Sequence, residues 1–191
     1  MYLDMILVMS EYGNGLERTG CKKERTLTVK PGATTPEVRL LFHPMVLTVA
    51  IGAKFNGGNG AHSGNVRIWG WSGSAWNKKG QDLDGEATGD IAGSAVALSS
   101  DGTIVAVGAQ YNDGMNGDFS GHVRVWQWGE PLLYWKPMGS NASIDGEAAE
   151  DYSGNAVALS SAGDVLAIGA YYNDGAGGGN NVGHVRGWQF Q

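Results

Sequence analysis

The chain has 191 residues, which is enough for one ordinary domain with a hydrophobic core of its own. Its 42% hydrophobic and 17% charged residues exclude a charge-rich disordered chain, and no apolar run reaches the roughly 18 residues of a membrane-spanning helix. The net charge of −6 argues against nucleic-acid binding, and the single cysteine, Cys21, excludes both an internal disulfide and a thiolate zinc site.

Glycine is the outlier of the composition. The chain holds 32 glycines, roughly 17% of its residues against about 7% in average proteins. They fall between apolar runs, as the turn residues of an all-β fold do.

Residues 1–35 are expected to form a poorly ordered or degenerate N-terminal segment. Its apolar run, Met5-Ile6-Leu7-Val8-Met9, follows Asp4 and has no basic start, so it makes a poor signal peptide. Residues 26–29 alternate like a strand, and a further strand is expected at residues 36–42.

Three units with one internal pattern follow. In each, an apolar run ends in Gly-Ala (residues 52–53, 108–109 and 169–170), and a Gly-rich loop leads to a run that contains tryptophan. Gly52 and Gly108 lie 56 residues apart, and Gly108 and Gly169 lie 61 apart. The first two units add a weaker run, at 75–80 and 134–139, and an acidic connector. Four strand-like runs in a period near 60 predict a radial or stacked β-repeat.

We therefore predict an all-β fold of β-propeller-type blades, each with four antiparallel strands. The first, degenerate blade is expected at residues 36–90, the second at 91–151, and the third, without its fourth strand, at 152–191. The first two strands of a blade carry small or apolar residues on both faces, which predicts burial between neighbouring sheets. Pro137 cannot donate a ladder hydrogen bond, so the fourth strand is expected at an edge.

Longer motifs recur within these units. Residues 92–102, 105–109 and 121–125 contain, in order, Val-Ala-Leu-Ser-x-x-Gly, Val-Ala-x-Gly-Ala and Gly-His-Val-Arg-Val; residues 153–163, 166–170 and 183–186 repeat much of this. Over about residues 45–191 the chain thus resembles the Gly-rich branch of the FG-GAP repeats of integrin-α-like β-propellers. The resemblance implies a non-catalytic module for adhesion or recognition, at an extracellular location or the cell surface, with a protein or glycan ligand.

The chain departs from that family at its turns. Many members carry an Asp-x-Asp-x-Asp-Gly calcium loop between the first two strands, where this chain has Ser99-Ser100-Asp101-Gly102 and Ser160-Ser161-Ala162-Gly163. One carboxylate and then none cannot supply the six to eight oxygen ligands of calcium. No cofactor or metal is expected. Calcium, the cation that the family binds, is the one alternative to this expectation.

Two alternatives remain. The runs at residues 98–102 and 123–126 also resemble a WD40 blade, which implies an intracellular protein-interaction scaffold, but WD40 units have about 40–45 residues. A carbohydrate-active enzyme built on a propeller ranks third. Its acid and base would come from the acidic connectors, and these recur in each unit whereas an active site usually occurs once.

The candidate ligand loop lies after the second strand of each unit. Asn112 and Asp113 occupy it in one unit, with Asp118 nearby, and Asn173 and Asp174 occupy it in the next. Asn, Asp and Gly also form turns through hydrogen bonds to their own backbone, which is the competing interpretation.

The number of units yields a separate expectation. Family propellers close with about seven blades, and this chain has about two and a half to three. Its terminal blades are expected to expose apolar faces, as in a fragment, an incomplete gene model or a self-associating unit.

Overall fold

The computed structural model describes residues 5–11, 23–28, 37–42, 46–139, 143–175 and 181–190, with side chains from residue 48 onward. The described elements are all strands, and none of the described residues forms a helix that could cross a membrane. The strands are β1 (Met5–Glu11), β2 (Lys23–Thr28), β3 (Glu37–Phe42), β4 (Val46–Ala53), β5 (Asn65–Trp71), β6 (Trp76–Lys78), β7 (Leu83–Asp84), β8 (Ala95–Leu98), β9 (Ile104–Ala109), β10 (His122–Gly129), β11 (Tyr134–Pro137), β12 (Ser143–Asp145), β13 (Ala156–Leu159), β14 (Val165–Ala170) and β15 (His184–Gln189).

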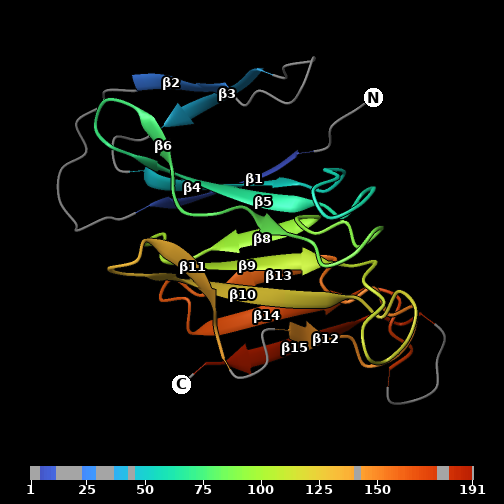
Figure 1. The fold of residues 1–191 in the computed structure, drawn as a ribbon. Helices are drawn as coiled ribbons and strands as arrows, with labels where there is room; N and C mark the ends of the chain where they lie inside the picture. The colour runs from blue at the N-terminus through green and yellow to red at the C-terminus, as the bar shows by residue number, and fades with distance from the viewer. Residues whose placement is uncertain are drawn as a thin grey trace.

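The strands form three antiparallel blades. The first has the order β1-β4-β5-β6, the second β8-β9-β10-β11, and the third β13-β14-β15. The short strands β7 and β12 pair with the outer edges of β5 and β10, beside β6 and β11. Figure 1 shows the blades stacked in chain order, and β8 packs against β1 and β4 while β13 packs against β8 and β9. The predicted all-β fold of antiparallel blades is confirmed, and the chain is a β-propeller-like repeat domain.

The inner strand of the first blade comes from a different part of the chain than the predicted bounds imply. β1, inside residues 1–35, pairs with β4 from Met5↔Ala53 to Glu11↔Val46, whereas β3 pairs only with β2 in a separate two-stranded sheet. An inner strand lies between neighbouring sheets and needs apolar residues on both faces. Residues 5–9 supply an unbroken apolar run, but Glu37 and Arg39 interrupt the apolar residues of β3.

Two apolar layers fill the spaces between the blades. Between the first and second blades, Val66 and Ile68 pack with Val105 and Val107, and Trp135 of β11 closes the outer side of the layer. Between the second and third blades, Val123 and Val125 of β10 pack in one cluster with Leu166 and Ile168 of β14. Each blade is thus held mainly by burial of aliphatic area against the next one.

A glycine contact sets how closely the blades approach. A Cβ on Gly52 would lie under 3.0 Å from the carbonyl oxygen of Gly93, and a Cβ on Gly108 would lie equally close to that of Gly154. Gly93 and Gly154 have φ of 84° and 85°, a conformation that other L-residues rarely adopt. In the first two blades the glycine of the Gly-Ala ending therefore lets the backbone of the next blade rest on the second strand.

Trp135 anchors the outer side of the first interface. Its side chain is 1% exposed, and its indole N–H donates a 2.7 Å hydrogen bond to the carbonyl oxygen of Lys79 in the first blade. The backbone N–H of Trp135 donates to Gln81 Oε1 at 2.9 Å. This packing between blades fits the recurrence of tryptophan in the sequence.

The glycine contact gives a direct test by substitution. We expect Gly108→Ala to destabilise the fold by about 2–3 kcal/mol, because the added methyl meets backbone that cannot rotate away. The measurement is urea unfolding followed by circular dichroism. Gly187→Ala is the matched control, since a Cβ there meets nothing within 4 Å, and it should cost under about 0.5 kcal/mol. Equal losses in the two variants would contradict the proposed role of the contact.

Candidate binding surface

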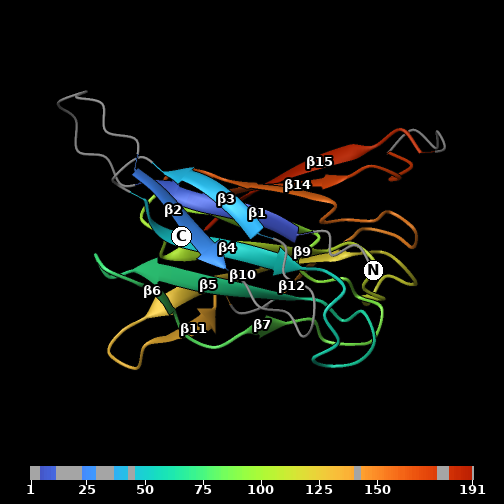
Figure 2. The same cartoon turned by 90° about the horizontal axis from the view of Figure 1, so that it is seen from above.

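The candidate loops extend from one end of the blades. Residues 110–121 connect β9 to β10, residues 171–183 connect β14 to β15, and the connector of residues 146–155 leads into β13. Figure 2 shows the described parts of these loops at the same end of the sheets, on the right. The structure therefore places the predicted loops of neighbouring blades side by side at one end of the domain.

Three of the predicted ligand residues accept hydrogen bonds within their own loops. The amides of Asn112 and Asn173 are buried, and Asn173 Oδ1 accepts from Gly175 N–H at 2.9 Å, while its Nδ2 donates to Asp151 Oδ2 of the connector at 2.9 Å. Asp113 Oδ1 accepts from the Phe119 N–H at 3.0 Å, and Asp174 Oδ1 accepts from the Asn181 N–H at 2.8 Å. These contacts are those of the competing turn interpretation.

Asp118 is exposed, and its carbonyl oxygen accepts from Glu150 N–H at 2.9 Å. Among the described residues no three His, Cys, Asp or Glu side chains are grouped closely enough to hold a metal ion. The candidate residues of the two loops thus form a polar border at one end of the blades and are not gathered around one point.

Aromatic side chains gather beside these loops. We call this group the aromatic patch; its members are Tyr111, Phe119, Tyr152, Tyr171 and Tyr172. Tyr152 lies at its centre, with ring centroids 5.3 Å from Tyr111, 6.0 Å from Phe119 and 5.6 Å from Tyr171. Phe119, Tyr171 and Tyr172 remain 41%, 46% and 43% exposed. The patch joins two loops and a connector into one apolar surface.

Two residues of the patch have left-handed backbone. Phe119 and Tyr152 have φ of 52° and 53°, a region that costs a bulky residue about 1–3 kcal/mol. The Tyr152 N–H donates to the Phe119 carbonyl oxygen at 3.1 Å, which locks the connector against the loop. The first blade repeats the geometry with His62 and Ile91, at φ of 57° and 55°. There Phe55 and His62 pair with ring centroids 5.3 Å apart, but Ile91 takes the place of the central tyrosine.

The surroundings of the patch are acidic. Asp113, Asp118 and Glu150 are exposed on the same loops and connector. Burial, together with the neighbouring Tyr111 and Glu150, raises the pKa of Tyr152 above its usual value, and burial also raises that of Tyr171. Both phenols are therefore neutral near pH 7, so the patch offers apolar ring faces and hydroxyl groups inside a negative border.

Sequence reasoning missed the patch because its members are far apart in the chain. The repeat register places Phe55, Tyr111 and Tyr172 at one loop position, each before an asparagine, and that regularity is a usable signal. Nothing in the spacing indicates that Phe119 and Tyr152 meet them. Their approach depends on the packing of one blade on the next.

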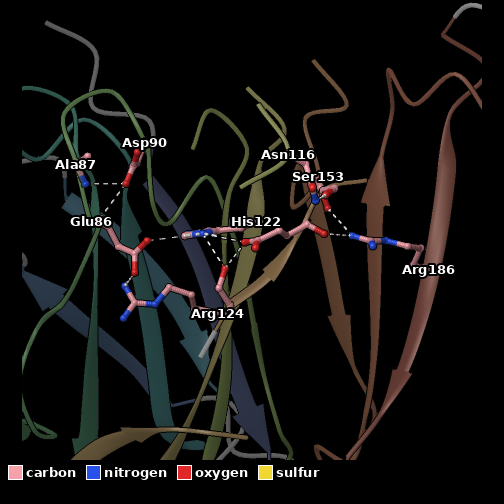
Figure 3. A network of polar contacts seen from close by, with 11 residues as sticks. Glu86, Ala87, Asp90, Asn116, His122, Arg124, Ser153 and Arg186 are labelled. Atoms are coloured by element: carbon pink, nitrogen blue, oxygen red, sulfur yellow. Dashed lines mark hydrogen bonds and ion pairs between the residues drawn. The ribbon is translucent and has the colours of Figure 1, made fainter. Parts of the chain in front are cut away.

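The acidic connectors hold the blades together. Asp90 is 3% exposed, and its Oδ2 accepts from the Glu86 and Ala87 N–H groups at 2.9 and 2.8 Å. The Glu86 carboxylate lies 3.3 Å from Arg124 Nη1 and 3.9 Å from His122 Nδ1. Figure 3 shows this network crossing from the first connector to β10 and on to Arg186 of the third blade. Asp151 repeats the role of Asp90 at Glu147 and Ala148.

The turn at Ser99 is closed by hydrogen bonds to the carboxylate of Asp101. Ser99 Oγ donates to Asp101 Oδ1 at 2.6 Å, and the Thr103 N–H and Oγ1 donate to the same carboxylate at 3.0 and 2.8 Å. Burial alone would raise the pKa of Asp101, but these hydrogen bonds outweigh it and hold the pKa below the usual value. In the third blade the counterpart of Ser99 is Ser160, whose Oγ donates to Asp164 Oδ1 at 2.6 Å. Asp164 is the counterpart of Thr103, so this carboxylate lies two positions later in the repeat than Asp101.

We expect Asp101→Ala to lower the free energy of unfolding by about 1–3 kcal/mol, because the buried Ser99 hydroxyl loses its acceptor. The double variant Asp101→Ala with Thr103→Asp reproduces the third-blade arrangement and should recover most of the loss. Calorimetric melting with millimolar calcium or with a chelator is the measurement. A calcium-dependent melting temperature would show that the turn is a cation site after all.

His122 predicts a pH dependence of stability. Burial, and less strongly Arg124, lowers its pKa below 6.5, against the opposing charges of Glu86, Asp90 and Asp145. Because the pKa of His122 is lower in the folded state, the unfolded state takes up a proton first as the pH falls. The free energy of unfolding is therefore unaffected above the unfolded pKa of about 6.5 and decreases as the pH falls below it. We expect urea unfolding to show this loss between pH 7 and 5. His122→Asn, the residue at the equivalent position 65, should flatten the curve; an unchanged slope would refute the assignment.

Comparison with known proteins adds little to this description. No family model matches the chain, and no curated protein matches it. Among solved structures, the chain is similar to the crystal structure of the RRP9 WD40 repeats, with 16% sequence identity and a TM-score of 0.34. The alignment covers 87% of this chain and 62% of the RRP9 chain, so this chain spans less than two thirds of the length of the RRP9 chain.

Proposed function

We propose that this chain is a non-catalytic recognition module, of the FG-GAP adhesion type that its motifs resemble, and that it binds a protein through the aromatic patch. The observation that carries the proposal is the set of exposed, mutually contacting rings. Exposed Tyr and Phe side chains supply large contact area with little rotamer entropy to lose on binding.

The shape and charge of the patch favour a protein over a glycan. Most of its ring pairs meet edge to face or at a tilt, as Tyr171 and Tyr172 do with centroids 4.6 Å apart. The rings therefore form an uneven surface and not the single flat face on which a sugar ring stacks. Asp113, Asp118 and Glu150 at its border match a partner that is apolar in the centre and basic at the rim. An extracellular location belongs to the same proposal and rests on the FG-GAP resemblance.

Blade length supports the FG-GAP type over the WD40 scaffold. β6 and β11 are fourth strands inside repeats of 56 and 61 residues, longer than the WD40 period. The enzyme alternative has less support, because Asp90 and Asp151 are occupied by the backbone N–H groups of their own connectors.

The test compares two matched tyrosines. Tyr172 in the patch is 43% exposed and Tyr134 on β11 is 40% exposed. Binding of the chain to a panel of immobilised extracellular matrix proteins and to an array of neutral glycans is measured by interferometry. We expect a matrix protein to bind, Tyr172→Ser and Phe119→Ser to weaken it at least tenfold, and Tyr134→Ser to leave it unchanged. Binding only to a glycan, turnover of a glycan, or equal effects of both tyrosine substitutions would overturn the proposal.

A further inference from the structure

A lysine of the chain itself lies over the aromatic ring of the first interface. In the repeat register Phe55 is the counterpart of Tyr111 in the aromatic patch. Lys54 Nζ lies 5.0 Å from the centroid of the Phe55 ring, within the range of a cation–π contact. The residue at the Lys54 position beside Tyr111 is Gln110, whose Oε1 accepts a hydrogen bond from Asn155 Nδ2. The patch therefore has a neutral amide where the first interface has an ammonium group.

Carboxylates show the reverse distribution. The Glu150 N–H donates to the Asp118 carbonyl oxygen at 2.9 Å, and in the first interface the Gly89 N–H donates to the Ala61 carbonyl oxygen at 3.0 Å. These equivalent hydrogen bonds identify Gly89 and Ala61 as the counterparts of Glu150 and Asp118. The first interface thus combines a lysine with uncharged residues, whereas the patch combines two exposed carboxylates with a glutamine.

The carboxylates of Asp118 and Glu150 have no basic partner in the described part of the chain. None of the ion pairs found there includes either residue. The described lysines and arginines that lie over aromatic rings all use rings outside the patch. Burial is the main cause of the raised pKa of Tyr152, and the charge of Glu150 adds to it, which places this carboxylate near the central ring.

Rings and carboxylates attract a cation together. The face of an aromatic ring carries the negative part of its quadrupole, and a carboxylate beside it adds direct Coulomb attraction. The exposed rings of Phe119, Tyr171 and Tyr172 offer such faces inside the acidic border. A partner with a basic group can therefore supply the charge that the first interface takes from Lys54.

We propose that the aromatic patch receives a lysine side chain of its protein partner, with the ammonium group over a ring and beside the carboxylates of Asp118 and Glu150. This rests on the proposed function, because it names the partner group that the same surface takes. Lysine fits because an ammonium group already lies over the equivalent ring of the first interface, at Lys54. The four-carbon stem of a lysine packs on apolar rings while its charged end reaches the acidic border.

The probe is the tripeptide Gly-Lys-Gly, blocked at both ends and titrated into the full chain while the tyrosine ring signals are followed by nuclear magnetic resonance. We expect saturable shifts of the signals from the patch tyrosines. The same peptide with an acetylated lysine keeps the stem and loses the charge. It should bind about tenfold more weakly, because acetylation removes both the cation–π contact and the attraction to the carboxylates.

Substitutions in the chain locate the ammonium group. Glu150→Gln and Asp118→Asn should each weaken binding about threefold or more. Glu130→Gln is the matched control, because exposed Glu130 follows β10 at the end opposite to the patch, and it should change nothing. Gln110→Lys reproduces the Lys54 arrangement of the first interface and should weaken binding about fivefold or more, since an internal ammonium group then occupies the site. Circular dichroism checks the fold of each variant.

Four results would overturn the proposal: no saturable binding of the lysine peptide, equal binding of its acetylated form, an equal loss in Glu130→Gln and Glu150→Gln, or unchanged binding in Gln110→Lys. The matrix protein of the earlier test separates this proposal from the proposed function. If Tyr172→Ser weakens binding of that protein while Glu150→Gln and Asp118→Asn do not, the lysine proposal is wrong and the patch remains a protein-binding surface.

Discussion

The backbone contact between glycines of consecutive blades is the constraint on which the rest of the structure depends. Gly52 meets Gly93 and Gly108 meets Gly154, so that backbone rests on backbone near the inner strands. A side chain at either place would hold the blades apart there. On the outer side the spacer is Trp135, among the largest side chains available. Contact without side chains on the inner side and an indole on the outer side make the first interface a wedge, which is the geometry of a propeller.

The same approach positions the aromatic patch. Because the third blade rests on the second, the connector before β13 reaches the loop after β9, and the Tyr152 N–H bonds to the Phe119 carbonyl oxygen. Phe119 and Tyr152 adopt left-handed backbone at this contact, and His62 and Ile91 do the same at the first interface. The backbone arrangement therefore belongs to the repeated scaffold. The side chains differ, because the first interface has one Phe55–His62 ring pair and no counterpart of the Tyr152 ring.

Repetition also allows the third blade to be compared with the other two. On the outer edges of β5 and β10 an aliphatic residue and an aspartate lie opposite Val66 and Asn65, and opposite Val123 and His122, whereas within the described residues β15 pairs only with β14. Val185 and His184 can be interpreted only against Val123 and His122, since a single exposed valine on a surface needs no explanation. A repeat protein thus carries an internal reference for each of its own sites.

The sequence by itself determined the repeat, the four-strand order of the first two blades and the edge position of the strand with Pro137. These properties follow from local patterns, because side-chain alternation, glycine spacing and turn residues act within a few positions of each other. The tertiary structure alone decided that residues 5–11 form the inner strand of the first blade and that Tyr152 meets Phe119 and Tyr111. Both involve residues that are distant in the chain and adjacent only after packing, and no local pattern encodes which distant partner a strand or a ring will find.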